Sequence, residues 1–153
     1  MDWLLDLITN PFFITSLTSW FIAQVTKTII HAVINKKVDF ERLFGDGGMP
    51  SGHSATVTSL AVLSALIYGT GSFEFAVTAI LAIIVCHDAM GVRRETGKQA
   101  IIINEITKAF DVLSTNQLPE VKLKEFVGHS PIQVIAGALI GVANACFIYF
   151  IVL

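Results

Sequence analysis

Hydrophobic residues are gathered along the chain into four long runs that polar stretches separate. The runs cover roughly residues 11–34, 54–70, 72–90 and 131–153. A helix that spans a bilayer needs about 20 mostly apolar residues, and each run comes close to that length. The pattern therefore predicts four transmembrane helices. The second and third are joined by the short turn YGTGS and are expected to form a helical hairpin.

A fifth segment, near residues 98–114, has helical periodicity but is too polar to cross a membrane. Its apolar positions are Ile102, Ile103, Ile106, Phe110 and Leu113. The polar positions opposite them are Asn104, Glu105, Lys108 and Asp111. This periodicity predicts an amphipathic helix that lies at the membrane interface or caps the bundle. The predicted fold class for residues 1–153 is thus a single all-α domain, a membrane-embedded bundle of about four helices plus this one.

Composition supports the assignment to the membrane. The chain is 54% hydrophobic and only 14% charged, with a mean hydropathy of +0.71, whereas soluble domains carry about 25% charged residues. The net charge of −2 gives no reason to expect a nucleic-acid partner. The first residues lack the basic stretch of a cleavable signal peptide, so the first span is expected to remain in the mature protein.

Basic residues indicate how the chain is oriented in the membrane. All 10 Lys and Arg residues lie between positions 27 and 124, and every one except Lys27 falls in the 35–53 or the 91–128 connection. In a protein with four spans these two connections share one face, which the positive-inside rule makes cytoplasmic. We therefore expect a multi-pass cell-membrane protein with both termini outside. Spans this few and short are also compatible with a homodimer, which stays open.

The segment GDGGMPSGHSA, residues 45–55, leads into the second hydrophobic run. A glycine-rich turn before a helix points several backbone N–H groups at one spot, and the helix dipole adds to their attraction for an anion. His53 would lie in the first turn of that helix, beside the anion and at the membrane surface. A loop with an ordinary serine cap is the alternative, and this pattern alone does not exclude it.

A second histidine precedes the last hydrophobic run, in KLKEFVGHSPIQVIAGALIG, residues 122–141. His129 comes just before Pro131, and proline is favoured in the first turn of a helix. Gly137 and Gly141 have the spacing that lets another helix approach closely. Because both histidines stand at helix starts on one membrane face, we expect them to lie within reach of each other.

Polar residues within and after the spans add candidate cations. The first run carries a polar stripe of Ser16, Gln24, Lys27 and His31. An intramembrane lysine indicates function by default, although Lys27 could instead extend its amine to the membrane surface. Arg93 and Arg94 follow the third run; they are suited to binding phosphate or could simply mark topology. His87 and Asp88 suggest a metal, but no further ligand stands at a diagnostic spacing, so no metal is predicted.

Three blocks of this sequence, GGMPSGHSA, DAMGVRRETGKQA and GHSPIQVIAGALIG, together resemble the phosphatidic acid phosphatase type 2 superfamily. They are most similar to its divergent bacterial and plant branch, which is also described as acid phosphatase/vanadium-dependent haloperoxidase-related. The resemblance covers nearly the whole chain. It implies a membrane phosphatase that hydrolyses a lipid phosphate or pyrophosphate through a histidine nucleophile, without a cofactor.

The resemblance also implies roles for individual residues. His53 would protonate the leaving group, and His129 would attack phosphorus. Ser51 and Gly52 would donate hydrogen bonds to the phosphoryl group. Gln133 stands where the superfamily has the aspartate that orients the nucleophile. The cations that would replace the superfamily's early basic motif are Lys27, Arg93, Arg94 and Arg42.

Two other classes of function stay open. A non-catalytic lipid-phosphate binder or lipid transporter on the same fold is favoured by Gln133 and by Leu123, which stands where the superfamily has an arginine. A structural membrane subunit would need neither histidine. Release of phosphate from defined lipids separates these classes.

Overall fold

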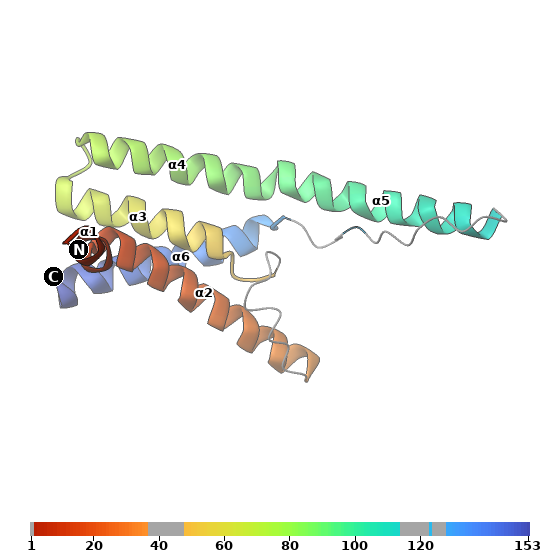
Figure 1. Cartoon of the computed structure of the whole chain (residues 1–153), viewed down its shortest axis with the longest axis horizontal. Coiled ribbons are helices and arrows are strands. Elements are labelled where there is room, and N and C mark those ends of the chain that lie inside the picture. Colours follow the sequence, from red (N-terminus) through yellow and green to blue (C-terminus); the bar gives the residue numbers. More distant parts are fainter. Residues whose placement is uncertain (1, 37–47, 114–122, 124–127) are drawn as a thin grey trace.

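Helices form every regular element in the computed structural model, which describes residues 2–36, 48–113, 123 and 128–153 (Figure 1). In chain order the elements are α1 (Asp2–Thr9), α2 (Pro11–Asn35), α3 (Gly52–Tyr68), α4 (Phe73–Met90), α5 (Val92–Leu113), α6 (Pro131–Phe147) and the π-helical turn η2 (Ile148–Val152).

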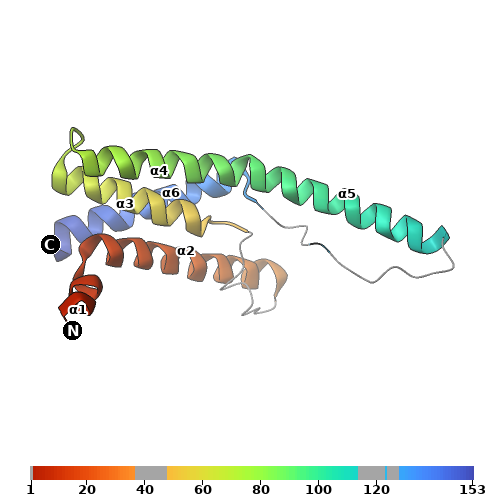
Figure 2. The same ribbon diagram turned by 45° about the horizontal axis from the view of Figure 1, so that its top comes forward.

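The helices begin at residues that satisfy the first backbone N–H groups. The Asn10 side chain accepts hydrogen bonds from the N–H groups of Phe12 and Phe13, at 2.9 and 3.2 Å. It stands at the bend where α1 turns away from the axis of α2 (Figure 2). Ser72 accepts a hydrogen bond from the N–H of Phe75, at 3.1 Å, and so caps α4. With η2 continuing α6, the helices α2, α3, α4 and α6 closely match the four predicted runs.

Among the described residues, three helical stretches are long and apolar enough to cross a membrane: Pro11–Asn35, Phe73–Phe110 and Pro131–Val152. The shorter apolar helix α3 has 17 residues, which corresponds to a length of about 26 Å. The predicted class, an all-α membrane bundle, is confirmed.

The short helix α3 lies at the centre and contacts α2, α4 and α6. Its buried face is built largely from small residues, so its neighbours can approach closely. Gly137 of α6 lies against the carbonyl group of Ser51, and Gly141 lies against the carbonyl oxygen of Ala55. A Cβ atom at either glycine would collide with this backbone, so the close helix contact predicted from their spacing is confirmed.

A polar contact within the bundle joins α6 to α2. The Asn144 side-chain amide donates to the carbonyl oxygen of Thr15, the Oγ1 of Thr18 and the Oγ of Ser19, at 3.1, 2.9 and 2.8 Å. Side-chain hydrogen bonds of this kind stabilise helix contacts in the absence of a hydrophobic driving force. Asn144 therefore fixes α6 against α2 at the end of the bundle where the chain termini lie (Figure 1).

The amphipathic helix begins earlier than the sequence predicts. It starts at Val92 rather than near residue 98, and it continues the line of α4 past the rest of the bundle instead of capping it (Figures 1 and 2). Helical hydrogen bonds run through the junction, because the Gly91 N–H donates to the His87 carbonyl (2.8 Å) and the Glu95 N–H donates to that of Gly91 (3.0 Å). Gly91 thus separates α4 from α5 without turning the chain in a new direction (Figure 1).

The covered face of α5 also differs from the prediction. Asn104, expected on the polar outer side, is buried. Its amide nitrogen donates to the carbonyl oxygen of Leu123, and its Oδ1 accepts from the Leu123 N–H, both at 3.0 Å. Glu105 and Lys108 are exposed, and so are the apolar side chains Ile101, Ile102, Ile103, Ile106 and Phe110. Asn104 is buried because its amide satisfies both backbone groups of Leu123, which an isoleucine cannot do.

Large apolar side chains also cover the outer face of α4, among them Ile80, Ile83 and Ile84. Such a face is stable in hydrocarbon, because lipid chains replace water as its surroundings. The homodimer stays a prediction.

The segments that carry the two histidines lie at one end of the bundle. There α2 and α4 end and α3 and α6 begin (Figures 1 and 2). Both chain termini and the turn between α3 and α4 lie at the opposite end.

Candidate active site

Two histidines meet where α3 and α6 begin. His53 lies in the first turn of α3, and His129 lies just before Pro131, the first residue of α6. Their imidazole rings are 6.5 Å apart, centroid to centroid, and are tilted by 56°. The expectation that these two residues lie close together is confirmed.

Ser51 joins the two histidine-bearing segments. Its backbone N–H donates to the carbonyl oxygen of Gln133, at 3.0 Å. Its Oγ accepts from the N–H and the hydroxyl group of Ser54, at 3.3 and 3.0 Å, as an N-cap of α3. The Ser51 N–H is therefore occupied within the protein. A hydrogen bond from Ser51 to a phosphoryl group has to come from its hydroxyl hydrogen.

Gln133 holds His129 in one tautomer. The Oε1 of Gln133 accepts the backbone N–H of Ser130 at 3.0 Å, and it lies 3.3 Å from the Nδ1 of His129. The N–H donor identifies this atom as the oxygen of the amide, so the hydrogen of the second contact belongs to Nδ1. In the neutral ring, the lone pair is then on Nε2, the nitrogen that remains for a ligand or a reaction.

The surroundings of His129 favour its neutral form. The residue is 3% exposed, and burial lowers the pKa of its imidazole below the usual value. The hydrogen bond with Gln133 opposes this shift, whereas Lys27, His53 and Arg93 lower the pKa further through their charge. His129 is therefore neutral over a wider pH range than an ordinary histidine.

The position of His129 depends on the preceding residue, Gly128, which has no predicted role. Gly128 has a φ of +88°, and a Cβ atom there would collide with the backbone of Arg93 and Arg94. In addition, the His129 N–H donates to the carbonyl oxygen of Ala89, at 3.0 Å. A glycine before the histidine lets this segment lie directly on the junction of α4 and α5.

The predicted cations lie in different environments. Lys27 is buried, and its Cγ lies 3.3 Å from the position that a Cβ of Gly48 would take. Arg93 forms an ion pair with Asp88, with 2.7 Å between Nε and Oδ2, and its side chain is 45% exposed. The Arg94 side chain is exposed. Arg42 lies outside the described residues. Lys27 and Arg93 are near enough to influence His129.

Gly52 has a packing role as well as its predicted binding role. A Cβ atom on Gly52 would lie 3.2 Å from the Cδ1 of Trp20 and 3.8 Å from the Cδ of Gln24. The missing side chain thus makes room for α2 beside the first turn of α3. The N–H of Gly52 remains one of the helix-terminal donors that have no partner within α3.

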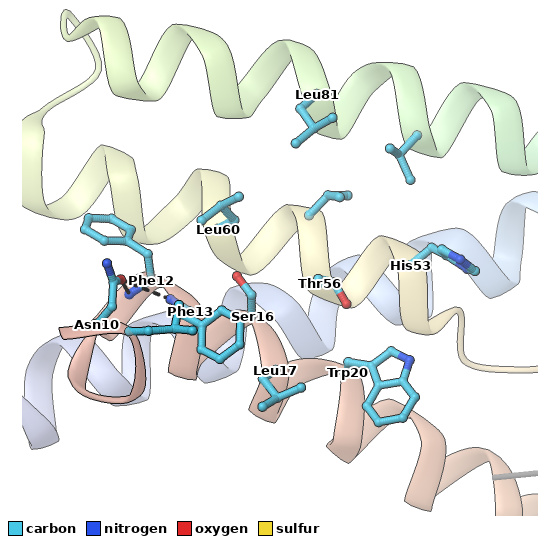
Figure 3. Close-up of a pocket in the computed structure, with 13 residues that line it drawn as sticks. Asn10, Phe12, Phe13, Ser16, Leu17, Trp20, His53, Thr56, Leu60 and Leu81 are labelled. Atoms are coloured by element: carbon cyan, nitrogen blue, oxygen red, sulfur yellow. Dashed lines mark hydrogen bonds between the residues drawn. The ribbon is translucent and has the colours of Figure 1, made fainter. Parts of the chain in front are cut away.

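An apolar groove of about 740 Å³ runs from His53 between α2, α3 and α4 (Figure 3). It could not be predicted from local sequence, because its lining comes from four helices, including Leu7 of α1. Its side chains include Leu7, Phe12, Phe13, Leu17, Trp20, Val57, Leu60, Leu81 and Val85. Ser16, Thr56 and Asn10 add a few polar atoms. His53 therefore lies between this apolar groove and the polar residues around His129.

No cluster of three or more metal-ligating side chains (His, Cys, Asp or Glu) occurs in the part of the chain that the structure describes. Of the pair considered from the sequence, His87 is exposed, and Asp88 binds Arg93.

The sequence is similar to those of known proteins. The model of the Divergent PAP2 family matches residues 8–144. A Bacillus subtilis (strain 168) protein described as the uncharacterized membrane protein YuiD is 41% identical over 147 residues, which cover 90% of this chain and 93% of that protein. No solved structure matches significantly. Because the family model covers most of the chain, including both histidine-bearing segments, this membrane protein belongs to the Divergent PAP2 family.

Proposed function

We propose that the protein is a phosphatase that hydrolyses a lipid phosphate or pyrophosphate at the membrane surface. The observation that carries this proposal is the pairing of His53 and His129 where α3 and α6 begin, with ring centroids 6.5 Å apart. Their environments differ, since His129 is buried and bonded to Gln133 whereas His53 is only half-buried. Membership of the Divergent PAP2 family supports a phosphatase-like protein.

In the proposed reaction the Nε2 of His129 attacks phosphorus, and the bond from phosphorus to the lipid oxygen breaks. His53 gives a proton to that oxygen, so the lipid leaves as an alcohol, or as a phosphate if the substrate is a pyrophosphate. Water then attacks the phosphohistidine, and His53 takes a proton from it. Inorganic phosphate leaves, and both histidines regain their first state.

Charge stabilisation comes from groups around the two rings. Phosphoryl transfer depends mainly on positioning and on neutralising the charge of the phosphoryl oxygens. Lys27 supplies a buried cation, and Arg93 a more exposed one. The N–H of Gly52 and the dipole of α3 add partial positive charge. Arg94 and Arg42 are proposed to help bind the anion.

The groove beside His53 supports a lipid substrate rather than a soluble one. Its lining is almost entirely apolar, and two of the helices beside it, α2 and α4, belong to stretches long and apolar enough to cross a membrane. A hydrocarbon chain in this groove would bring its phosphate head to His53. The distribution of basic residues supports a site on the cytoplasmic side.

The test is phosphate release by purified protein in detergent from alkyl phosphates of increasing chain length. Rates at low substrate concentration are expected to rise with chain length, because each buried methylene contributes about 0.8 kcal/mol to binding. Equal rates for short and long chains would contradict a lipid substrate.

A non-catalytic binder of lipid phosphates is the second candidate. It is favoured by Gln133, because a neutral amide cannot stabilise the imidazolium of His129 by charge. Saturable binding of alkyl phosphates with no phosphate release from any of them would support the binder over the enzyme.

A further inference from the structure

We propose that Gln24 of α2 binds the phosphoryl group, with Lys27, at the start of α3. The inference deepens the proposed function and rests on it for the identity of the ligand. It gives a phosphoryl-binding role to a side chain of the polar stripe along the first hydrophobic run.

The first observation is an unsatisfied polar atom. The Gln24 side chain is 5% exposed, and its Oε1 has no hydrogen-bond partner among the described residues. A buried carbonyl oxygen without a hydrogen-bond partner is unfavourable, because it has lost its water without replacement. Such an atom next to a binding site is explained if a ligand completes its hydrogen bonds.

The second observation is where this amide lies. The Cδ of Gln24 is 3.8 Å from the position of a Cβ on Gly52, the first residue of α3. The N-terminus of a helix attracts anions through its N–H groups and its dipole. Gln24 therefore faces the turn where a phosphoryl group is expected.

The third observation is the neighbouring cation. Lys27 follows Gln24 by three residues on the same face of α2. It is also buried, and its stem lies beside Gly48 in the turn before α3. Thus α2 places the amide of Gln24 beside Gly52 and the stem of Lys27 beside Gly48, in the segment that leads into α3.

The chemistry of an amide suits this position. The two ends of the Gln24 amide are interchangeable by a rotation of the terminal bond. One orientation presents an N–H₂ group that donates to phosphoryl oxygens, and the other presents an oxygen that accepts from a protonated phosphoryl oxygen. Gln24 can therefore bind the anion without adding charge next to Lys27.

The experiment compares Gln24→Leu with the wild-type protein in detergent, using binding of inorganic phosphate and of dodecyl phosphonate, which cannot be hydrolysed. Both ligands present a PO3 group to the site, and only the second carries a lipid chain. Gln24→Leu should weaken both by the same factor, roughly 10- to 100-fold, the range for a hydrogen bond to a charged group. Gln24→Asn keeps an amide on a side chain that is shorter by one methylene group, and it should retain part of the phosphate affinity.

Gln99→Leu is the matched control, because Gln99 is exposed on α5; it should bind both ligands as the wild type does. Thermal unfolding checks that Gln24→Leu is folded. Wild-type affinity for both ligands in Gln24→Leu would overturn the inference, as would a loss for dodecyl phosphonate alone, which would place Gln24 against the chain. Absence of phosphate and phosphonate binding in the wild type would overturn it too. Binding without turnover would refute the enzyme and leave the Gln24 result valid.

Discussion

The backbone N–H of Ser51 donates a hydrogen bond to the carbonyl oxygen of Gln133, with 3.0 Å between nitrogen and oxygen. Ser51 precedes His53 by two residues, and Gln133 contacts the Nδ1 of His129. One backbone hydrogen bond therefore sets the distance between the two histidine-bearing segments. The glycine face of α6 makes this bond possible, because Gly137 lies against the carbonyl group of Ser51.

A first prediction concerns this contact. Gly137→Ala places a Cβ against the Ser51 backbone, which cannot move without separating α3 from α6. We expect the free energy of unfolding to fall by about 1–3 kcal/mol, as for other overpacked sites, and phosphate release to fall with it. The measurement is thermal unfolding of the purified protein in detergent.

Gly71→Ala is the control for this substitution, because a Cβ on Gly71 meets no atom within 4 Å. If Gly137→Ala unfolds at the same temperature as Gly71→Ala, the contact between α3 and α6 contributes less to stability than the structure indicates.

The sequence was sufficient to predict the hydrophobic helices and the glycine contact. Long apolar runs have few alternatives to membrane-spanning helices, and the spacing of Gly137 and Gly141 is local information. The proximity of His53 and His129 followed from topology, because both stand at helix starts on one face. These features depend on short stretches of chain or on the number of spans.

Other features depend on contacts between distant segments and could not be read from local patterns. Asn104 was assigned to the outer face because it is polar, yet it binds the backbone of Leu123. The contact of Gly128 with the backbone of Arg93 joins residues that lie even farther apart in the sequence. In a membrane, moreover, an apolar face is stable when it is exposed, so periodicity alone does not identify the covered side of a helix.

A second prediction follows from the pKa of His129. Attack on phosphorus needs the neutral ring, and burial lowers the pKa of this residue from its usual 6.5. Activity should therefore be retained as the pH falls through 6.5 and be lost only at lower pH, as His129 gains its proton. The measurement is kcat/KM for a soluble phosphate monoester against pH. A loss of activity centred above pH 6.5 and caused by His129 would contradict the assignment.

A third prediction adds charge beside His129. Gln133→Glu keeps the length of the side chain and its acceptor for the Ser130 N–H, and it adds a negative charge near Nδ1. That charge favours the imidazolium, so the acid limb of the pH profile should move to higher pH. Gln99→Glu, on the exposed side of α5, should leave the profile in place. An unchanged acid limb in Gln133→Glu would show that His129 does not control it.

A fourth prediction concerns His53 as the proton donor. His53→Ala should bind dodecyl phosphonate normally and release phosphate roughly 10²- to 10⁴-fold more slowly, the usual contribution of general acid catalysis. The loss should be smallest for substrates whose leaving group needs no proton, such as pyrophosphates or aryl phosphates. An equal loss for alkyl and aryl phosphates would argue against proton donation by His53.

The central claim is that His129 becomes phosphorylated, and trapping the phosphoenzyme tests it most directly. Wild-type protein and His129→Asn are mixed with a radiolabelled long-chain alkyl phosphate, quenched in alkali, which preserves phosphohistidine, and analysed by peptide mapping. The account predicts label on the peptide that contains His129 in the wild type, and neither label nor phosphate release in His129→Asn. Phosphate release by the wild type with no label on His129, or full activity of His129→Asn, would contradict it.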